Sequence, residues 1–149
     1  MAGMAGQLHN KQLRNERRPF GYAIVASGYI QPEEAEVWAR DLKRLISEGG
    51  RAEFGLLIDA RQQPVQPPGT NAIIQDVMLW LRSHGVRRSA LVTDNAVLLL
   101  QVKRLAAEAG TGRMERYIDV RHTPDWERVA TEWIEHGIEP PVHGEGVSA

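Results

Sequence analysis

Apolar residues recur at helical spacing in four segments of the chain, and a glycine follows each segment. Side chains three and four residues apart lie on one face of an α-helix, so such a stripe predicts a helix packed against a core. Gly49, Gly85, Gly110 and Gly137 are suited to left-handed caps at the ends of these helices. The pattern predicts helices at residues 32–48, 71–84 and 95–109, and a fourth that begins at Thr123 and Pro124.

Short runs rich in branched and aromatic residues separate these helices and predict strands. The runs at residues 54–59 and 89–93 are almost continuously apolar, as expected of interior strands covered by helices on both faces. The run at residues 22–30 alternates more loosely, and a strand at about residues 8–18 could form a hairpin with it. With a last strand at residues 116–120, alternating strands and helices predict right-handed βαβ units. We expect an α/β fold with a mixed, mostly parallel sheet of four to five strands and four helices.

The length and composition of the chain fit one globular domain. Its 149 residues can bury a sizeable core, and 42% hydrophobic and 25% charged residues are ordinary globular values. We expect residues 20–138 to form the domain and residues 1–19 to be an N-terminal extension or edge strand. Residues 139–149, with two prolines and two glycines, are predicted to be a flexible tail.

Charge and cysteine content narrow the classes of function. Lysine and arginine number 18 against 19 aspartate and glutamate, a net charge of -1, so we expect no nucleic-acid partner. Without cysteine there is no disulfide, thiol nucleophile or thiolate metal site. No segment approaches the roughly 18 apolar residues of a membrane span, and residues 1–10 lack a signal-peptide core. We expect a cytoplasmic protein that does not span a membrane.

Polar residues gather after the predicted strands. Ligands of open α/β sheets usually bind there, because helix N-termini direct free N–H groups toward that edge. Asp94 and Thr123 could instead be N-caps of the helices that follow, and the arginines could simply neutralise nearby carboxylates. The predicted ligand- or partner-binding rim comprises Asp59, Arg61, Thr70, Asn71, Asp94, Asn95, Arg121 and His122.

Three prolines stiffen the loop between the strand at residues 54–59 and the helix that follows it. Thr70, at the end of this loop, could cap the helix. An exposed Thr70 hydroxyl could also accept a phosphoryl group, or the backbone there could hold an anion. The loop lacks the spacing of a phosphate-binding P-loop, and no G-x-G-x-x-G occurs, so nucleotide hydrolysis is not indicated.

The sequence shows no signature of catalysis. Of five histidines, only His122 lies near the predicted rim, and Asp119, three residues earlier on a strand, should face the opposite way. No G-x-S-x-G nucleophile elbow occurs. We therefore expect no catalytic residues, no metal and no cofactor. An enzyme that uses Asp59, Asp94 and His122 as acid–base groups is kept as a third hypothesis.

The predicted helix at residues 95–109 begins with a run that is apolar on nearly all sides. A neighbouring helix or loop could bury Val97, Leu99 and Leu100. Alternatively, these three side chains form an association surface for a protein partner or for a second copy of the chain, as in a homodimer.

Several segments of the sequence resemble the STAS family, in particular its SpoIIAA-like branch of small bacterial proteins. They are YAIVASGYI, LLIDAR, WLRSHGVRRSALVTD and LLLQVKRLAAEAG, and the likeness covers residues 22–137. The resemblance implies a mixed sheet with helices packed on it and activity by binding, as in anti-sigma-factor antagonists, transporter appendages and ligand sensors. SpoIIAA-like proteins have also been likened to lipid-binding Sec14 domains. The phosphorylated antagonists carry a D-S-S-G-type loop, whereas QQPVQPPGTN stands here without serine.

The sequence thus supports two principal hypotheses. The first is a non-catalytic regulatory module that binds a protein partner through the proline-rich loop and the rim. The second is a sensor or carrier of a small anionic or amphipathic ligand, such as a lipid or a nucleotide.

Overall fold

A computed structural model describes residues 12–141 of the chain. Most of the predicted tails, residues 1–11 and 142–149, lies outside the described residues, so the domain boundaries stay a prediction. No helix among residues 12–141 is long and apolar enough to cross a bilayer.

A five-stranded sheet forms the centre of the molecule. β1 is antiparallel to β2, and the remaining neighbours are parallel. This arrangement confirms the predicted α/β fold, the mixed and mostly parallel sheet, and the N-terminal hairpin. In spatial order the strands are β1 (Gln12–Arg18), β2 (Gly21–Ser27), β3 (Phe54–Asp59), β4 (Val86–Thr93) and β5 (Glu115–Asp119).

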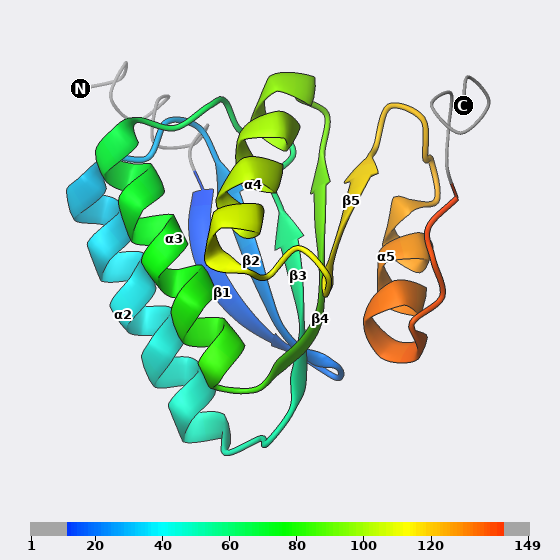
Figure 1. Cartoon of the computed structure of the whole chain (residues 1–149), viewed down its shortest axis with the longest axis horizontal. Helices are drawn as coiled ribbons and strands as arrows, with labels where there is room; N and C mark the ends of the chain where they lie inside the picture. Colours follow the sequence, from blue (N-terminus) through cyan, green and yellow to red (C-terminus); the bar gives the residue numbers. More distant parts are fainter. Residues whose placement is uncertain (1–11, 142–149) are drawn as a thin grey trace.

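In the described part of the chain, four helices cover the two faces of the sheet unequally. Successive parallel strands are neighbours, and right-handed crossovers between them place their helices on one face. That face carries α2, α3 and α4, with α3 between the other two, and α5 lies alone on the opposite face (Figure 1). The helices are α2 (Pro32–Gly49), α3 (Pro68–Ser83), α4 (Ala96–Ala109) and α5 (Trp126–His136).

The central strand β3 shows how the sheet feeds two cores. Because successive side chains of a strand point to opposite faces, Leu56 and Ile58 pack toward α2, α3 and α4. Leu57 points the other way and packs with Trp133 and Ile134 of α5. The continuous apolar run of this strand therefore has the predicted cause, which is burial on both faces.

α3 begins earlier than predicted because two prolines belong to its start. The helix begins at Pro68 instead of Asn71, with Pro67 as its N-cap. Proline suits the first helical positions because the N–H that it lacks would have no helical partner there. The prediction that Thr70 caps this helix is wrong, since Thr70 lies inside the first turn with its side chain buried.

The two other predicted N-caps are also wrong. Asn95 caps α4, and its Oδ1 accepts hydrogen bonds from two backbone N–H groups of the first turn at 3.0 and 3.1 Å. Asp94 lies one residue outside that role. α5 begins after Asp125, and Thr123 is buried before it.

The predicted glycine caps are confirmed at the ends of α4 and α5. Gly110 and Gly137 adopt left-handed conformations with φ of 76° and 70°. For α2 the left-handed cap is Gly50, one residue beyond the predicted Gly49. Gly49 is required for a different reason, because a Cβ there would collide with the Tyr22 hydroxyl.

Candidate functional site

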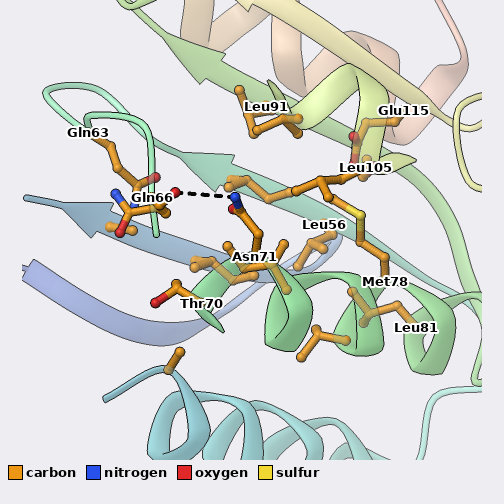
Figure 2. A pocket seen from close by; sticks show the side chains of 18 of the residues that line it. Leu56, Gln63, Gln66, Thr70, Asn71, Met78, Leu81, Leu91, Leu105 and Glu115 are labelled. Atoms are coloured by element: carbon orange, nitrogen blue, oxygen red, sulfur yellow. Dashed lines mark hydrogen bonds between the residues drawn. The ribbon is translucent and has the colours of Figure 1, made fainter. Parts of the chain in front are cut away.

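A cavity of about 100 Å³ lies between α3 and the sheet. We call it the α3 cavity. Apolar side chains from β3, β4, α3 and α4 form most of its wall, among them Leu56, Met78, Leu91 and Leu105 (Figure 2). Ile58 also lines the cavity and is only half-buried, although it lies on the central strand. The α3 face of the sheet is therefore not completely packed.

Gln66 fixes the loop at residues 62–67 over one end of the α3 cavity. It is 4% exposed, and its Oε1 accepts a hydrogen bond from the Ile30 N–H at 2.7 Å. Its Nε2 donates to the carbonyl oxygens of Gly28, at 3.1 Å, and Pro64, at 2.7 Å. These bonds join the proline-rich loop to the connection between β2 and α2.

Three further polar side chains complete this end, which we call the glutamine end. Gln63, Asn71 and Gln101 line the cavity with Gln66 and are half-buried. Gln101 and Asn71 donate to the Gln66 carbonyl oxygen, at 3.5 and 3.2 Å. Figure 2 shows Asn71 extending from α3 toward Gln66, with this hydrogen bond dashed. The Asn71 Nδ2 is thus used within the protein, whereas its Oδ1 has no partner among the described residues.

Thr70 also lines the α3 cavity, with only 1% of its surface exposed. Its hydroxyl donates to the Ile30 carbonyl oxygen at 2.7 Å, so it ties the start of α3 to the β2–α2 connection. A kinase would need this hydroxyl in solvent. The hypothesis of an exposed phosphorylation site at Thr70 is therefore wrong for this structure.

Glu115, at the start of β5, forms the opposite end of the cavity (Figure 2). It is 5% exposed, and its Oε2 accepts a hydrogen bond from the Ser89 hydroxyl at 3.1 Å. Its Oε1 is buried without a partner in the described part of the chain. Burial raises the pKa of Glu115, and the nearby Tyr117 and Ser89 hydroxyls oppose this only in part. The buried Tyr117 hydroxyl interacts with the same carboxyl group, but it has no partner within full hydrogen-bond distance among residues 12–141.

A third atom of the cavity wall has an unused hydrogen-bonding capacity. Trp38 of α2 lines the cavity, and its buried Nε1 has no acceptor among residues 12–141. The α3 cavity therefore combines apolar walls with three buried polar atoms, from Trp38, Asn71 and Glu115, that no described residue satisfies.

Part of the predicted rim lies toward α5, away from this cavity. Asp59 forms an ion pair with Arg61, whose Nη2 lies 2.8 Å from the Asp59 Oδ2. The Arg61 guanidinium lies 4.5 Å from the ring centre of Trp126 on α5. Asp94 accepts a hydrogen bond from the Gln62 N–H at 3.2 Å. Asp59, Arg61 and Asp94 line neither the α3 cavity nor the second cavity described next.

A second cavity, of about 610 Å³, follows the free edge of β5. Arg121, His122, Leu99 and Leu100 line it. Arg121 lies 2.6 Å from Asp119 and holds the pKa of that carboxyl below its usual range. The expectation that Asp119 faces away from His122 is wrong, since the chain turns after β5 and leaves the two side chains 4.0 Å apart.

The predicted rim is thus divided into separate groups. Thr70 and Asn71 belong to the α3 cavity, and Asn95 reaches the same loop through its Nδ2, which lies 3.3 Å from the Gln63 carbonyl oxygen. The division arises in part because Asp59 pairs with Val92, whereas Asp119, the partner of Arg121, pairs with Thr93. Val92 and Thr93 are successive residues of β4 and therefore point to opposite faces of the sheet. Whether any group binds a ligand or partner stays a prediction.

The predicted association surface is partly exposed. Val97 and Leu100 are 63% and 67% exposed, so the alternative that a neighbouring element buries them is wrong. Leu99 is half-buried beside them. Association itself stays a prediction.

Sequence reasoning missed the residues that define the two ends of the α3 cavity. Gln66, Gln101, Glu115 and Trp38 were not among the predicted site residues. No protein-family model matches the chain, and no curated protein is similar enough to count as a relative. The likeness to STAS proteins therefore stays a prediction, and the function must be argued from the geometry.

Proposed function

We propose that this protein is a non-catalytic module that binds a small, mainly apolar molecule in the α3 cavity, as a sensor or carrier. One observation carries the proposal. The cavity has apolar walls, yet Trp38 Nε1, Asn71 Oδ1 and Glu115 Oε1 are buried at it without partners in the described part of the chain.

The energetics favour an occupied cavity. Unfilled space in a core costs about 24 cal/mol per Å³, so about 100 Å³ corresponds to roughly 2 kcal/mol. A buried polar atom without a partner costs about 1–3 kcal/mol. Solvent can satisfy the polar atoms but not the apolar wall. A molecule with an apolar body and polar groups satisfies both. This supports the second hypothesis from the sequence, a sensor or carrier of a small ligand.

The chemistry of the wall supports binding in preference to catalysis. No histidine among residues 12–141 lines the α3 cavity, and the Thr70 hydroxyl donates to the Ile30 carbonyl oxygen. Asp59 and Asp94, two members of the acid–base set considered from the sequence, do not line it either. Ser89 is the wall hydroxyl that donates to a carboxyl group, but burial raises the pKa of that group, Glu115, and favours the neutral form, which does not take up the Ser89 proton.

The same geometry links binding to regulation. Gln66 and Asn71 touch both the α3 cavity and the loop at residues 62–67. A ligand that contacts them binds one loop position more tightly than others. It therefore shifts the population of loop positions by an amount set by that difference in affinity. The loop is the surface that the first sequence hypothesis assigned to a protein partner.

Titration of the full chain with n-hexane and 2-pentanone, followed by methyl NMR, tests the proposal. We expect saturable shifts of the Leu56 and Leu105 methyl signals, which lie at the cavity, and little change at Leu57 and Ile134, which belong to the α5 core and line neither cavity. No saturable shift with either probe would contradict the proposal.

A matched pair of variants locates the binding. Ile73 and Ile74 are both half-buried on α3, but only Ile74 lines the cavity. We expect Ile74→Phe to fill the space and weaken binding at least about tenfold. Ile73→Phe should leave the affinity within about twofold, and equal losses in both variants would place the binding elsewhere.

A further inference from the structure

We propose that the molecule held in the α3 cavity is uncharged and directs a hydrogen-bond acceptor, such as a carbonyl or ether oxygen, at the Glu115 Oε1. This inference rests on the proposed function and adds the chemical class and orientation of the ligand. Small ketones, aldehydes and esters belong to the class.

The hydrogen bond from Ser89 determines which Glu115 oxygen is available. Ser89 donates to the Oε2 at 3.1 Å, and its own backbone is held because the Trp133 Nε1 donates to its carbonyl oxygen at 2.8 Å. The Oε1 is left buried and without a partner among residues 12–141. In a neutral carboxyl group with Oε2 as acceptor, the Oε1 carries the proton and donates it.

The charges around Glu115 favour this neutral form. Arg116 is directed to the α5 face, where its guanidinium lies 4.0 Å from the Trp133 ring centre and pairs with Glu139. The Lys103 Nζ of α4 lies 5.3 Å from the Tyr117 ring centre, and no ion pair of the described residues includes Glu115. Burial without a counter-charge disfavours a carboxylate and raises the pKa of Glu115.

A charged ligand fits this arrangement poorly. An ammonium group would have to leave water, and its partner Glu115 would have to lose a proton inside an apolar wall. A carboxylate would meet no cation among the side chains that line the cavity. An uncharged acceptor needs no change in protonation, because the O–H group of neutral Glu115 can donate a hydrogen bond to it.

The volume limits the size of the molecule. A cavity of roughly 150 Å³ is known to hold benzene, and this one is about 100 Å³. About six non-hydrogen atoms, the size of benzene, is therefore an upper limit for a ligand that fits without displacement of α3. Its other end would lie toward the glutamine end, where the unpartnered Asn71 Oδ1 can accept a hydrogen bond.

Four probes of matched size, about six non-hydrogen atoms each, test the class: 2-pentanone, n-hexane, pentylamine and butanoate. Their dissociation constants are measured at pH 7 by methyl NMR on the unmodified full chain. We expect 2-pentanone and n-hexane to bind, and pentylamine and butanoate to bind at least about tenfold more weakly than 2-pentanone. Pentylamine as tight as 2-pentanone would overturn the inference, because it would indicate a charged Glu115 that pairs with cations.

Two variants of Glu115 test the orientation. Glu115→Gln keeps an N–H donor and an acceptor for Ser89, so 2-pentanone should bind within about twofold of the unmodified chain. Glu115→Leu removes the donor and should weaken 2-pentanone about tenfold, while n-hexane binds no less tightly. Equal effects of Glu115→Leu on both probes would overturn the inference. If neither n-hexane nor 2-pentanone binds the unmodified chain, the proposed function fails as well.

Discussion

The two faces of the sheet differ in how completely their cores are packed, and two tryptophans show the contrast. Trp133 of α5 is 6% exposed, and its Nε1 donates to the Ser89 carbonyl oxygen at 2.8 Å. Trp38 of α2 has a buried Nε1 without an acceptor in the described part of the chain, and its side chain borders the α3 cavity. One sheet thus supports a filled core and an unfilled one. Because the same chain packs α5 tightly, the space beneath α3 is a local property and not a general looseness of the fold.

The largest expected difference between the faces comes from removing these indoles. Trp133→Ala leaves a hole in a filled core and an unsatisfied Ser89 carbonyl, so we expect a loss of about 3–5 kcal/mol in the free energy of unfolding. Trp38→Ala should lose less than half as much, because Trp38 borders existing space and its N–H is already unsatisfied. Urea denaturation of both variants measures the difference. Equal losses would mean that the two faces are packed alike.

The opposite change, adding atoms to each face, should give an effect of intermediate size. A Cβ at Gly55 would collide with the Ile134 Cγ2, so Gly55→Ala should destabilise the protein by about 1–3 kcal/mol. Ala35 is 1% exposed but lines the α3 cavity, so Ala35→Leu adds three carbons where space exists. We expect it to cost less than about 1 kcal/mol. Thermal unfolding compares the two, and a larger loss for Ala35→Leu would contradict the contrast between the faces.

The sequence predicted the filled face better than the unfilled one, for a physical reason. Helical spacing predicts an inward face of α5 that consists of Trp126, Val129, Ala130, Trp133 and Ile134. The last four are buried, and Trp126 is half-buried. Periodicity reports which side chains point inward. It does not report whether they fill the space that they enclose, so Met78 and Leu105 give the same signal at a cavity as in a packed core.

Polar residues of the site escaped prediction for a related reason. Gln66 stands among prolines in an apparent surface loop, and its burial depends on Ile30 and Gly28, which are distant in sequence. The sequence around Glu115 gives little sign that this residue is buried. On β5 its side chain shares a face with Tyr117, while Arg116 and Ile118 point to the other face. The carboxyl group is buried because helices pack against that face, with Leu81 of α3 and Leu105 of α4 lining the same cavity. Asn71 was included in the predicted rim because it stands at a predicted helix start, where ligands of such sheets usually bind.

The last expected difference between the faces is in how their stability depends on pH. The buried core beneath α5 consists of apolar residues, whereas the α3 side holds Glu115, whose pKa burial raises from the ordinary 4.5. A raised pKa means that the folded state binds the proton more tightly than the unfolded state. The stabilisation is complete below the ordinary pKa and is lost as pH rises through the folded one. Between these two values we expect a loss of about 1.4 kcal/mol per pH unit in the unmodified chain relative to Glu115→Gln.

Comparison with Glu115→Gln isolates this carboxyl group from the others. Asp41 and Asp119 have lowered pKa values and contribute the opposite slope in both proteins, so their effects cancel in the difference. Amide hydrogen exchange of the two proteins then shows which elements lose stability. As pH rises, protection should fall relative to Glu115→Gln in α4 and the start of β5, which enclose Glu115, and stay equal in α5. A uniform loss across both faces would show that the sheet transmits the charge, and that the two cores do not respond independently.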